Sequence, residues 1–306
     1  GKVLYPGLIR DGYGARFSSG LVSSSGAIDI VIPPSIAMIL YGASAEQSVP
    51  KLFVAGILPG LLIAAMMAAY VVAMALRMGV KTSGGFNLTH FLRTTWDAGP
   101  ALFMPVLILA SIYLGLSSPT EAGGFACLYA ILVGRFVYRT LRWNDVFEAA
   151  IRSAMLTAQI LAIVATAALF SWILTVNGVP QALVSALQSL RLEPWAFLIL
   201  VNIILLIVGC FLDPTSAILV LTPLFVPIVK IVGIDPIHFG IVMTVNIAIG
   251  MFTPPFGLNI FVARLVLRVP LETIYRGVLP FAAVQILALL IITYWPELSL
   301  ILTRAL

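Results

Sequence analysis

Two stretches, IVIPPSIAMILYG (residues 30–42) and GMFTPPFGLNIFVA (residues 250–263), each place two adjacent prolines inside an apolar run. Proline removes a backbone donor, and its ring clashes with the preceding helical turn. In a bilayer, backbone groups freed by such a break cost several kcal/mol each unless they find partners. The sequence therefore predicts two helices that are interrupted in the same way.

The composition around these breaks is that of a membrane protein. Of 306 residues, 61% are hydrophobic and only 9% are charged, whereas soluble domains carry roughly 25% charged residues. Long tracts contain no Asp, Glu, Lys or Arg, and about 20 apolar residues span the hydrocarbon core as a helix; the tracts are 52–76, 98–120, 153–190, 194–212 and 277–296. Alternating segments of roughly 10 residues, typical of membrane β-strands, are absent. The sequence predicts an all-α polytopic membrane protein.

Several function classes have no support in the sequence. Basic residues follow apolar spans instead of clustering with aromatics, so no nucleic-acid partner is expected. The chain contains no P-loop and neither G-x-S-x-G nor H-E-x-x-H, so neither ATP hydrolysis nor an intramembrane hydrolase is expected. Its two histidines are far apart, and Cys127 and Cys210 lie in apolar tracts, which predicts buried free thiols and no metal site. We expect no enzyme and no cofactor.

The chain also contains an internal repeat. Proline and glycine positions recur at one ungapped offset, since 227−6, 233−12, 254−33, 277−56 and 280−59 all equal 221. Matches between apolar residues are frequent by chance in such a chain, but aligned Pro and Gly residues fix backbone geometry. We interpret the repeat as real.

Charge predicts that the two copies are inverted. Lys and Arg accumulate on the cytoplasmic side of short loops. The span 52–76 ends at Arg77, Lys81 and Arg93, whereas its partner, about 273–297, starts beside Arg264, Arg268 and Arg276. In this orientation, 13 of the 17 Lys and Arg residues lie on the cytoplasmic side of the membrane. The four on the opposite side are Lys51, Arg191, Lys230 and Arg304. Inverted repeats with discontinuous helices are typical of secondary transporters, whose sites lie at the breaks.

Polar residues interrupt the second copy at two places. Thr253, Pro254, Pro255 and Asn259 lie at the break, and Asp213 with Thr215 and Ser216 separates 195–212 from 217–229. We interpret these segments as a re-entrant hairpin with its tip near Asp213. An intramembrane acid is a functional candidate, although Asp213 could act simply as an N-cap, and both roles can coexist.

The first copy also contains candidate oxygen ligands before Pro33 and Pro34. They are Ser25, within the serine run 23–25, and Asp29. Oxygen ligands suit a hard cation. The serines could equally bond backbone carbonyls of their own helix, and both interpretations stay open here.

Five motifs, in order, resemble one known family from end to end: IPPSIAMILYG, SPTEAGGFACLYAILVG, AALFSWILT, FLDPTSAILVLTPLFVPI and TPPFGLNIFVA. They are similar to the large membrane subunit of tripartite ATP-independent periplasmic (TRAP) transporters. The resemblance implies an ion-transporter-superfamily fold of elevator type, in which a transport domain moves against a scaffold.

The resemblance also implies a function and partners. It implies Na⁺-coupled uptake of organic acids, such as C4-dicarboxylates or sialic acid, across the bacterial inner membrane. A periplasmic substrate-binding protein would deliver the substrate, and a small membrane subunit would brace the scaffold in the lipid bilayer.

Carried over by motif, the second-repeat Na⁺ site falls on Gly209, Gly250, Thr253 and Phe256. The offset of 221 then nominates Asp29, Ile32 and Ser35 for the first-repeat site. Further substrate or coupling candidates are Asp213, Thr215, Ser216, Pro33, Pro34, Pro254, Pro255, Asn259 and Ser25.

We expect one membrane domain with functional parts. Residues 1–50 and 191–268 would form the parts of the transport domain from repeats 1 and 2. Residues 51–190 would form scaffold spans and cytoplasmic arm helices, and residues 269–306 the C-terminal scaffold span. Family members have further spans, with a hairpin, before the point where this sequence begins, so we expect an N-terminally truncated chain. Two alternatives stay open: a stand-alone Na⁺-coupled carboxylate transporter of the same superfamily, and a structural membrane subunit without a site.

Overall fold

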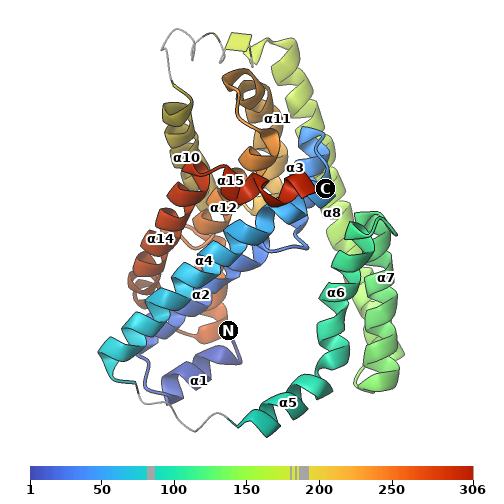
Figure 1. The fold of residues 1–306 in the computed structure, drawn as a ribbon, viewed down its shortest axis with the longest axis vertical. Helices are drawn as coiled ribbons and strands as arrows, with labels where there is room; N and C mark the ends of the chain where they lie inside the picture. The colour runs from blue at the N-terminus through green and yellow to red at the C-terminus, as the bar shows by residue number, and fades with distance from the viewer. Residues whose placement is uncertain (81–86, 180, 183–184, 186–192, 306) are drawn as a thin grey trace. The chain divides into compact units, whose positions relative to one another are not determined.

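The structure is a computed structural model that describes residues 1–80, 87–179, 181–182, 185 and 193–305 (Figure 1). Every regular element in these ranges is a helix and none is a strand, which confirms the all-α prediction for the described residues. Lys81 and Arg191, which entered the orientation argument, lie outside them.

Six described helices are long and apolar enough to cross a membrane, and the number rises to eight if each of two bent pairs is one span. The six are α4 (Val49–Met78), α7 (Pro119–Leu132) with the π-helical turn η1 (Val133–Val137), α8 (Trp143–Val176), α10 (Pro194–Phe211), α11 (Pro214–Val232) and α14 (Leu271–Tyr294). The bent pairs are α2 (Ala15–Val31) with α3 (Ile36–Ala45), and α5 (Leu88–Asp97) with α6 (Gly99–Tyr113).

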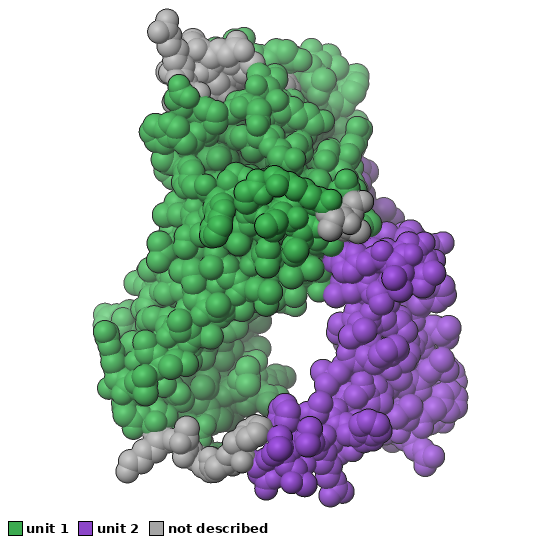
Figure 2. Space-filling view, in the orientation of Figure 1, with its two compact units in different colours: residues 1–82, 166–306 green, residues 83–165 purple. Residues whose placement is uncertain are grey.

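The chain divides into two compact units, coloured separately in Figure 2. Unit 1 comprises Gly1–Thr82 and Thr166–Leu306, and unit 2 comprises Ser83–Ala165. Unit 1 also holds α1 (Leu4–Arg10), α12 (Pro236–Gly250), α13 (Leu258–Leu267), α15 (Glu297–Leu300) and the short η2 (Leu302–Ala305). The functional division into transport and scaffold parts stays a prediction.

Within unit 1, helix boundaries recur at the offset found in the sequence. The first residues of α2, α3 and α4, moved by 221, fall at 236, 257 and 270, and α12, α13 and α14 begin at Pro236, Leu258 and Leu271. Gly12 and Gly233 both have positive φ, +93° and +81°, a conformation that glycine adopts without steric cost. The Pro33–Pro34 and Pro254–Pro255 bonds are both cis.

The centre of unit 1 is α12, which contacts α2, α3, α4, α10, α11 and α14. Every residue from His238 to Gly250 is buried. Close helix approach depends on glycine pairs: a Cβ on Gly250 would lie 2.4 Å from the Gly209 carbonyl carbon, and one on Gly20 would lie 2.2 Å from the Gly277 oxygen. Small residues allow such close approach between membrane helices.

Unit 2 is built around α6 and α7, which pack against each other. Tyr129 Oη donates to Pro100 O at 2.8 Å, and Tyr138 Oη donates to Asp97 O at 3.0 Å. The stretch around His90 forms α5, which is bent by 61° from α6. The chain around His90 is therefore helical from Leu88 to Asp97.

Two details of the sequence interpretation differ from the structure. The span expected to start near residue 153 begins at Trp143, because Asp145 at its first turn accepts from Arg142 N at 2.9 Å and extends the helix through charged residues. Cys127 is exposed in this chain, whereas Cys210 is buried. An apolar neighbourhood in sequence does not distinguish a protein-facing from an outward-facing helix surface.

Candidate functional site

The first break, residues 32–35, separates α2 from α3 with a bend of 42°. Ile32 ends α2 in an extended conformation, and Ser35 is the N-cap of α3. Ser35 Oγ donates to Ile30 O at 2.5 Å and accepts from Met38 N at 3.4 Å. The serine thereby gives partners to backbone groups on both sides of the break.

The second break, residues 251–257, separates α12 from α13. Thr253 Oγ1 donates to Ile249 O at 2.7 Å, and Asn259 N donates to Met251 O at 2.8 Å. Tyr275 Oη from α14 donates to Pro255 O at 2.9 Å. The backbone is thus held from inside the break and from a neighbouring helix.

Between α10 and α11 the helix stops at Leu212 and restarts at Pro214. Asp213 is the N-cap of α11, and its carboxylate accepts from Ser216 N at 3.1 Å and from Ser216 Oγ at 2.6 Å. The N-cap role considered for Asp213 is therefore present. Such a cap contributes about 1 kcal/mol.

A cavity of about 320 Å³ joins these elements. It is lined by Asp29, Ile30, Pro34, Ser35, Ile36, Ala37, Pro214, Thr215 and Met251. The lining includes the first turns of both α3 and α11, and a helix N-terminus carries a partial positive charge. Residues from three separate places in the sequence, the first break, the α10–α11 junction and the second break, thus meet at one cavity.

The second-repeat residues nominated for a cation also gather in one place. Gly209 and Gly250 are in backbone contact where α10 crosses α12. The rings of Phe256 and Phe211 pack in a tilted arrangement with centroids 5.1 Å apart. The α10–α11 junction therefore touches the second break on one side and the first break on the other.

Some nominated residues lie elsewhere. Ser25 Oγ donates to Leu21 O at 2.6 Å, and Ser23 Oγ donates to Ser19 O at 2.7 Å, so these serines bond carbonyls of their own helix. Asn259 Nδ2 reaches Ser23 O at 3.4 Å, and both residues line a different cavity of about 210 Å³. The structure does not bring Ser25 and Asn259 to the cavity that holds Asp29.

A buried network of hydrogen-bonded polar side chains was not predicted from the sequence. Asn246 Nδ2 donates to Asn202 Oδ1 at 2.7 Å, and Asn202 Nδ2 reaches Thr293 Oγ1 at 3.2 Å. His238 Nε2 lies 3.2 Å from Thr293 O. An asparagine inside an uncharged tract was the available signal, because buried amides need partners. This hydrogen-bond network connects α10, α12 and α14.

A sequence model of the family described as "Tripartite ATP-independent periplasmic transporter, DctM component" matches residues 1–298. The chain belongs to this family. As a member of the DctM component family it is a large permease subunit and a multi-pass membrane protein, and the family is not enzymatic.

Three relatives illustrate the likeness of this DctM-family chain to known proteins. The C4-dicarboxylate TRAP transporter large permease protein DctM of Pseudomonas aeruginosa is 41% identical over 99% of this chain and 71% of its own length. The isethionate TRAP transporter permease protein DctMQ of Oleidesulfovibrio alaskensis is 38% identical over 98% of this chain and 47% of its own length. The ectoine TRAP transporter large permease protein TeaC of Halomonas elongata is 37% identical over 99% of this chain and 71% of its own length.

Proposed function

We propose that this permease subunit carries a small organic acid across the bacterial inner membrane by Na⁺-coupled symport. The supporting observation is the 320 Å³ cavity shared by the first break, the α10–α11 junction and the second break. Discontinuous helices in transporters direct N-termini at anionic groups and unwound carbonyls at cations. The first turns of α3 and α11 and residues of both breaks line this cavity.

The anion would be attracted by the N-termini of α3 and α11. Thr215 lies in the first turn of α11 and lines the cavity, so its hydroxyl can donate to a carboxylate. The relatives are named for C4-dicarboxylates, isethionate and ectoine. We infer a cargo of this size and polarity, with at least one acidic group.

The cation would offset the charge of Asp29. This exposed carboxylate lines the same cavity and makes no hydrogen bond or ion pair with the described residues. It would repel an anionic cargo unless a cation lay nearby, because like charges at short range are costly where water is scarce. Na⁺ bound at the first break would remove this repulsion, which is a physical reason for coupling.

A second Na⁺ would bind where Gly209 meets Gly250. Because both residues are glycines, the backbones of α10 and α12 approach each other closely here. Hard cations prefer oxygen ligands such as backbone carbonyls. Thr253 uses its hydroxyl proton on Ile249 O, which leaves the oxygen lone pairs available. The Na⁺ sites nominated from the sequence are chemically compatible with these surroundings.

The movement we propose is an elevator. The two copies would be inverted, as the charge distribution indicates, and the breaks with the α10–α11 hairpin would move as one body past the scaffold. A periplasmic binding protein would deliver the cargo, and a small membrane subunit would hold the scaffold.

The test is uptake of labelled succinate, isethionate and ectoine into proteoliposomes. The full chain, its small subunit and a cognate binding protein are required, with and without a Na⁺ gradient. We expect uptake only with the gradient and the binding protein. Uptake without any binding protein would support the stand-alone carrier instead.

Three variants test the site itself. Asp213→Ala and Pro255→Ala should each lower Na⁺-dependent uptake more than tenfold, which corresponds to about 1.4 kcal/mol. Asp213→Asn keeps an N-cap side chain but removes the charge, so it separates the two roles of this residue. Undiminished uptake by all three would favour a structural subunit without a site.

A further inference from the structure

A second cavity in unit 1, of about 380 Å³, lies away from the proposed transport site. It is formed where the start of α2, the end of α4 and the start of α14 lie side by side (Figure 1). Arg16 and Arg276 line it together with Phe17, Tyr70, Met74 and Phe281. Its chemistry is therefore two guanidinium groups beside an apolar wall.

The apolar wall is an ordered aromatic cluster. The rings of Phe17 and Phe281 have centroids 5.5 Å apart, and Tyr70 meets Phe281 edge-on at 5.0 Å. Phe17 and Phe281 are buried, whereas Tyr70 and Met74 are half-buried. Met78 also lines the cavity and is 41% exposed, so an apolar surface is accessible there to an acyl chain.

The charges at this cavity are not balanced. Arg16 Nε donates to Arg276 O at 3.1 Å, which holds its guanidinium against the start of α14. Arg276 pairs with Glu272 at 2.7 Å, but its side chain is still 65% exposed. Arg16 forms no ion pair with an acid in the described part of the chain. Two positive groups thus face one carboxylate.

We propose that this cavity binds an anionic phospholipid, with the phosphate between Arg16 and Arg276 and an acyl chain along Tyr70 and Met74. A phosphate pairs well with the planar fork of arginine. A small organic acid would leave the aromatic wall uncovered, whereas a lipid satisfies both halves of the cavity. In the proposed orientation the cavity opens to the cytoplasmic leaflet, where basic pockets between helices bind anionic head groups.

The experiment is native mass spectrometry of the full chain released from nanodiscs. The discs contain equimolar phosphatidylglycerol and phosphatidylethanolamine, which differ in net charge. We expect retention of phosphatidylglycerol over phosphatidylethanolamine. Each of Arg16→Gln and Arg276→Gln should lower that retention about fivefold, since one basic residue near the surface contributes about 1 kcal/mol.

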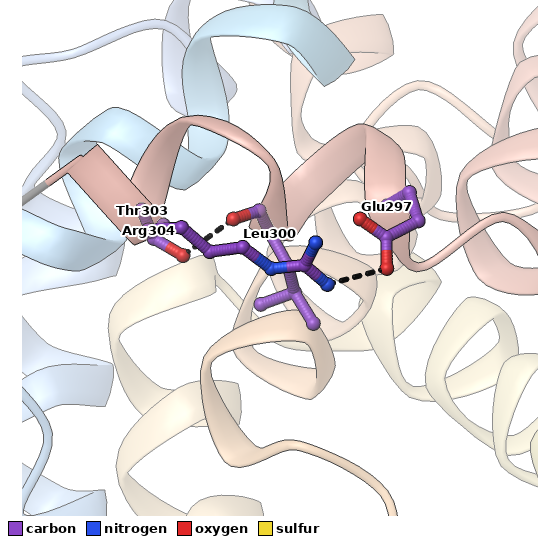
Figure 3. Close-up of polar contacts among 4 residues, drawn as sticks. All are labelled: Glu297, Leu300, Thr303 and Arg304. Atoms are coloured by element: carbon purple, nitrogen blue, oxygen red, sulfur yellow. Dashed lines mark hydrogen bonds and ion pairs between the residues drawn. The ribbon is translucent and has the colours of Figure 1, made fainter.

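Two further variants separate lipid binding from misfolding. Arg304→Gln is the matched control, because Arg304 is 66% exposed and pairs with Glu297 at 2.6 Å. Figure 3 draws this ion pair. The control variant should leave lipid retention unchanged. Met74→Trp fills the cavity without altering charge, so it should reduce retention of the lipid while the thermal unfolding temperature in lipid-free detergent stays at the parent value.

Several outcomes would overturn the proposal. They are equal retention of the two lipids, full retention by the Arg16→Gln/Arg276→Gln double variant, or an equal loss in Arg304→Gln. Displacement of phosphatidylglycerol by inorganic phosphate alone would show that the cavity selects a free anion and that the acyl chain contributes nothing. None of these outcomes depends on whether the chain transports a solute.

Discussion

Helices α2 and α12 occupy equivalent places in the repeat, yet their surroundings differ. Both begin at the same offset and lead to a cis Pro–Pro bond. All of α12 from His238 onward is buried, whereas α2 leaves Gly26 and Asp29 exposed. Helix α10 packs along α12 and contributes to its burial.

The comparison also applies to individual positions. Position 250 is a glycine in contact with Gly209, and the equivalent position 29, since 250−221 equals 29, is an aspartate lining an open cavity. Asn246 corresponds to Ser25, and each donates to a carbonyl four residues earlier. Only Asn246 also reaches a second helix, through Asn202. A repeated backbone therefore carries unequal packing and chemistry.

The largest expected effect is at the covered helix. Gly250→Ala places a Cβ 2.4 Å from the Gly209 carbonyl carbon, and neither backbone can yield easily. We expect a loss of about 3 kcal/mol in unfolding free energy, the upper range for overpacked sites. Thermal and denaturant unfolding in detergent measures it.

The control for this substitution is Gly7→Ala. Gly7 lies inside α1, and a Cβ there meets nothing within 4 Å. Alanine is better than glycine in a helix interior by about 0.5–1 kcal/mol, so the control should unfold at the parent temperature or slightly above it. Equal melting of Gly250→Ala and the parent would contradict the close α10–α12 crossing.

The equivalent positions 246 and 25 provide the next test. Asn246→Ala leaves Asn202 Oδ1 without its 2.7 Å donor in a buried place, which should cost about 2 kcal/mol. Ser25→Ala removes only a bond within its own helix and should change stability by less than about 0.5 kcal/mol. Comparable losses in the two variants would mean that the Asn246–Asn202 hydrogen bond does not hold α10 on α12.

A smaller effect is expected at the first break. Ser35→Ala removes the N-cap of α3, at a cost of about 1 kcal/mol, and should also lower uptake because Ser35 lines the shared cavity. Ser35→Asp can restore the cap and adds a second carboxylate beside Asp29. We expect Ser35→Asp to recover stability but not uptake of an anion. Recovery of both would show that only the cap matters.

The smallest effect is expected at the second break. Tyr275→Phe deletes one exposed hydrogen bond to Pro255 O, worth about 0.5 kcal/mol at the low end for such bonds. Unfolding should barely change, and Na⁺-dependent uptake should persist. A large loss of uptake would indicate that Tyr275 orients the Pro255 carbonyl for a ligand.

Much of the fold was predictable from local chemistry. Long uncharged tracts indicated membrane helices because unpaired charges are costly in lipid. The prolines located both breaks because they remove backbone donors. Asp213 was identified both as an acid in an apolar segment and as a possible cap, and its hydrogen bonds to Ser216 confirm the cap.

Other features depend on which distant segments meet. The exposed Cys127 and the buried Cys210 have similar apolar neighbours in sequence. The carbonyl acceptors of the serine hydroxyls and the wall shared by Asp29 and Thr215 also have no local signal. Contacts between residues almost two hundred positions apart are set by helix packing.

The sequence alone determined that this chain is a helical membrane protein with a repeat broken twice by paired prolines, because hydropathy and proline geometry act locally along the chain. Only the tertiary structure decided that α10 covers α12 and that the N-terminus of α11 meets the first break. The first arrangement rests on close approach at Gly209 and Gly250 and on buried amide pairing. The second is seen in the cavity that the starts of α3 and α11 line together, and both are properties of two helices together and of neither alone.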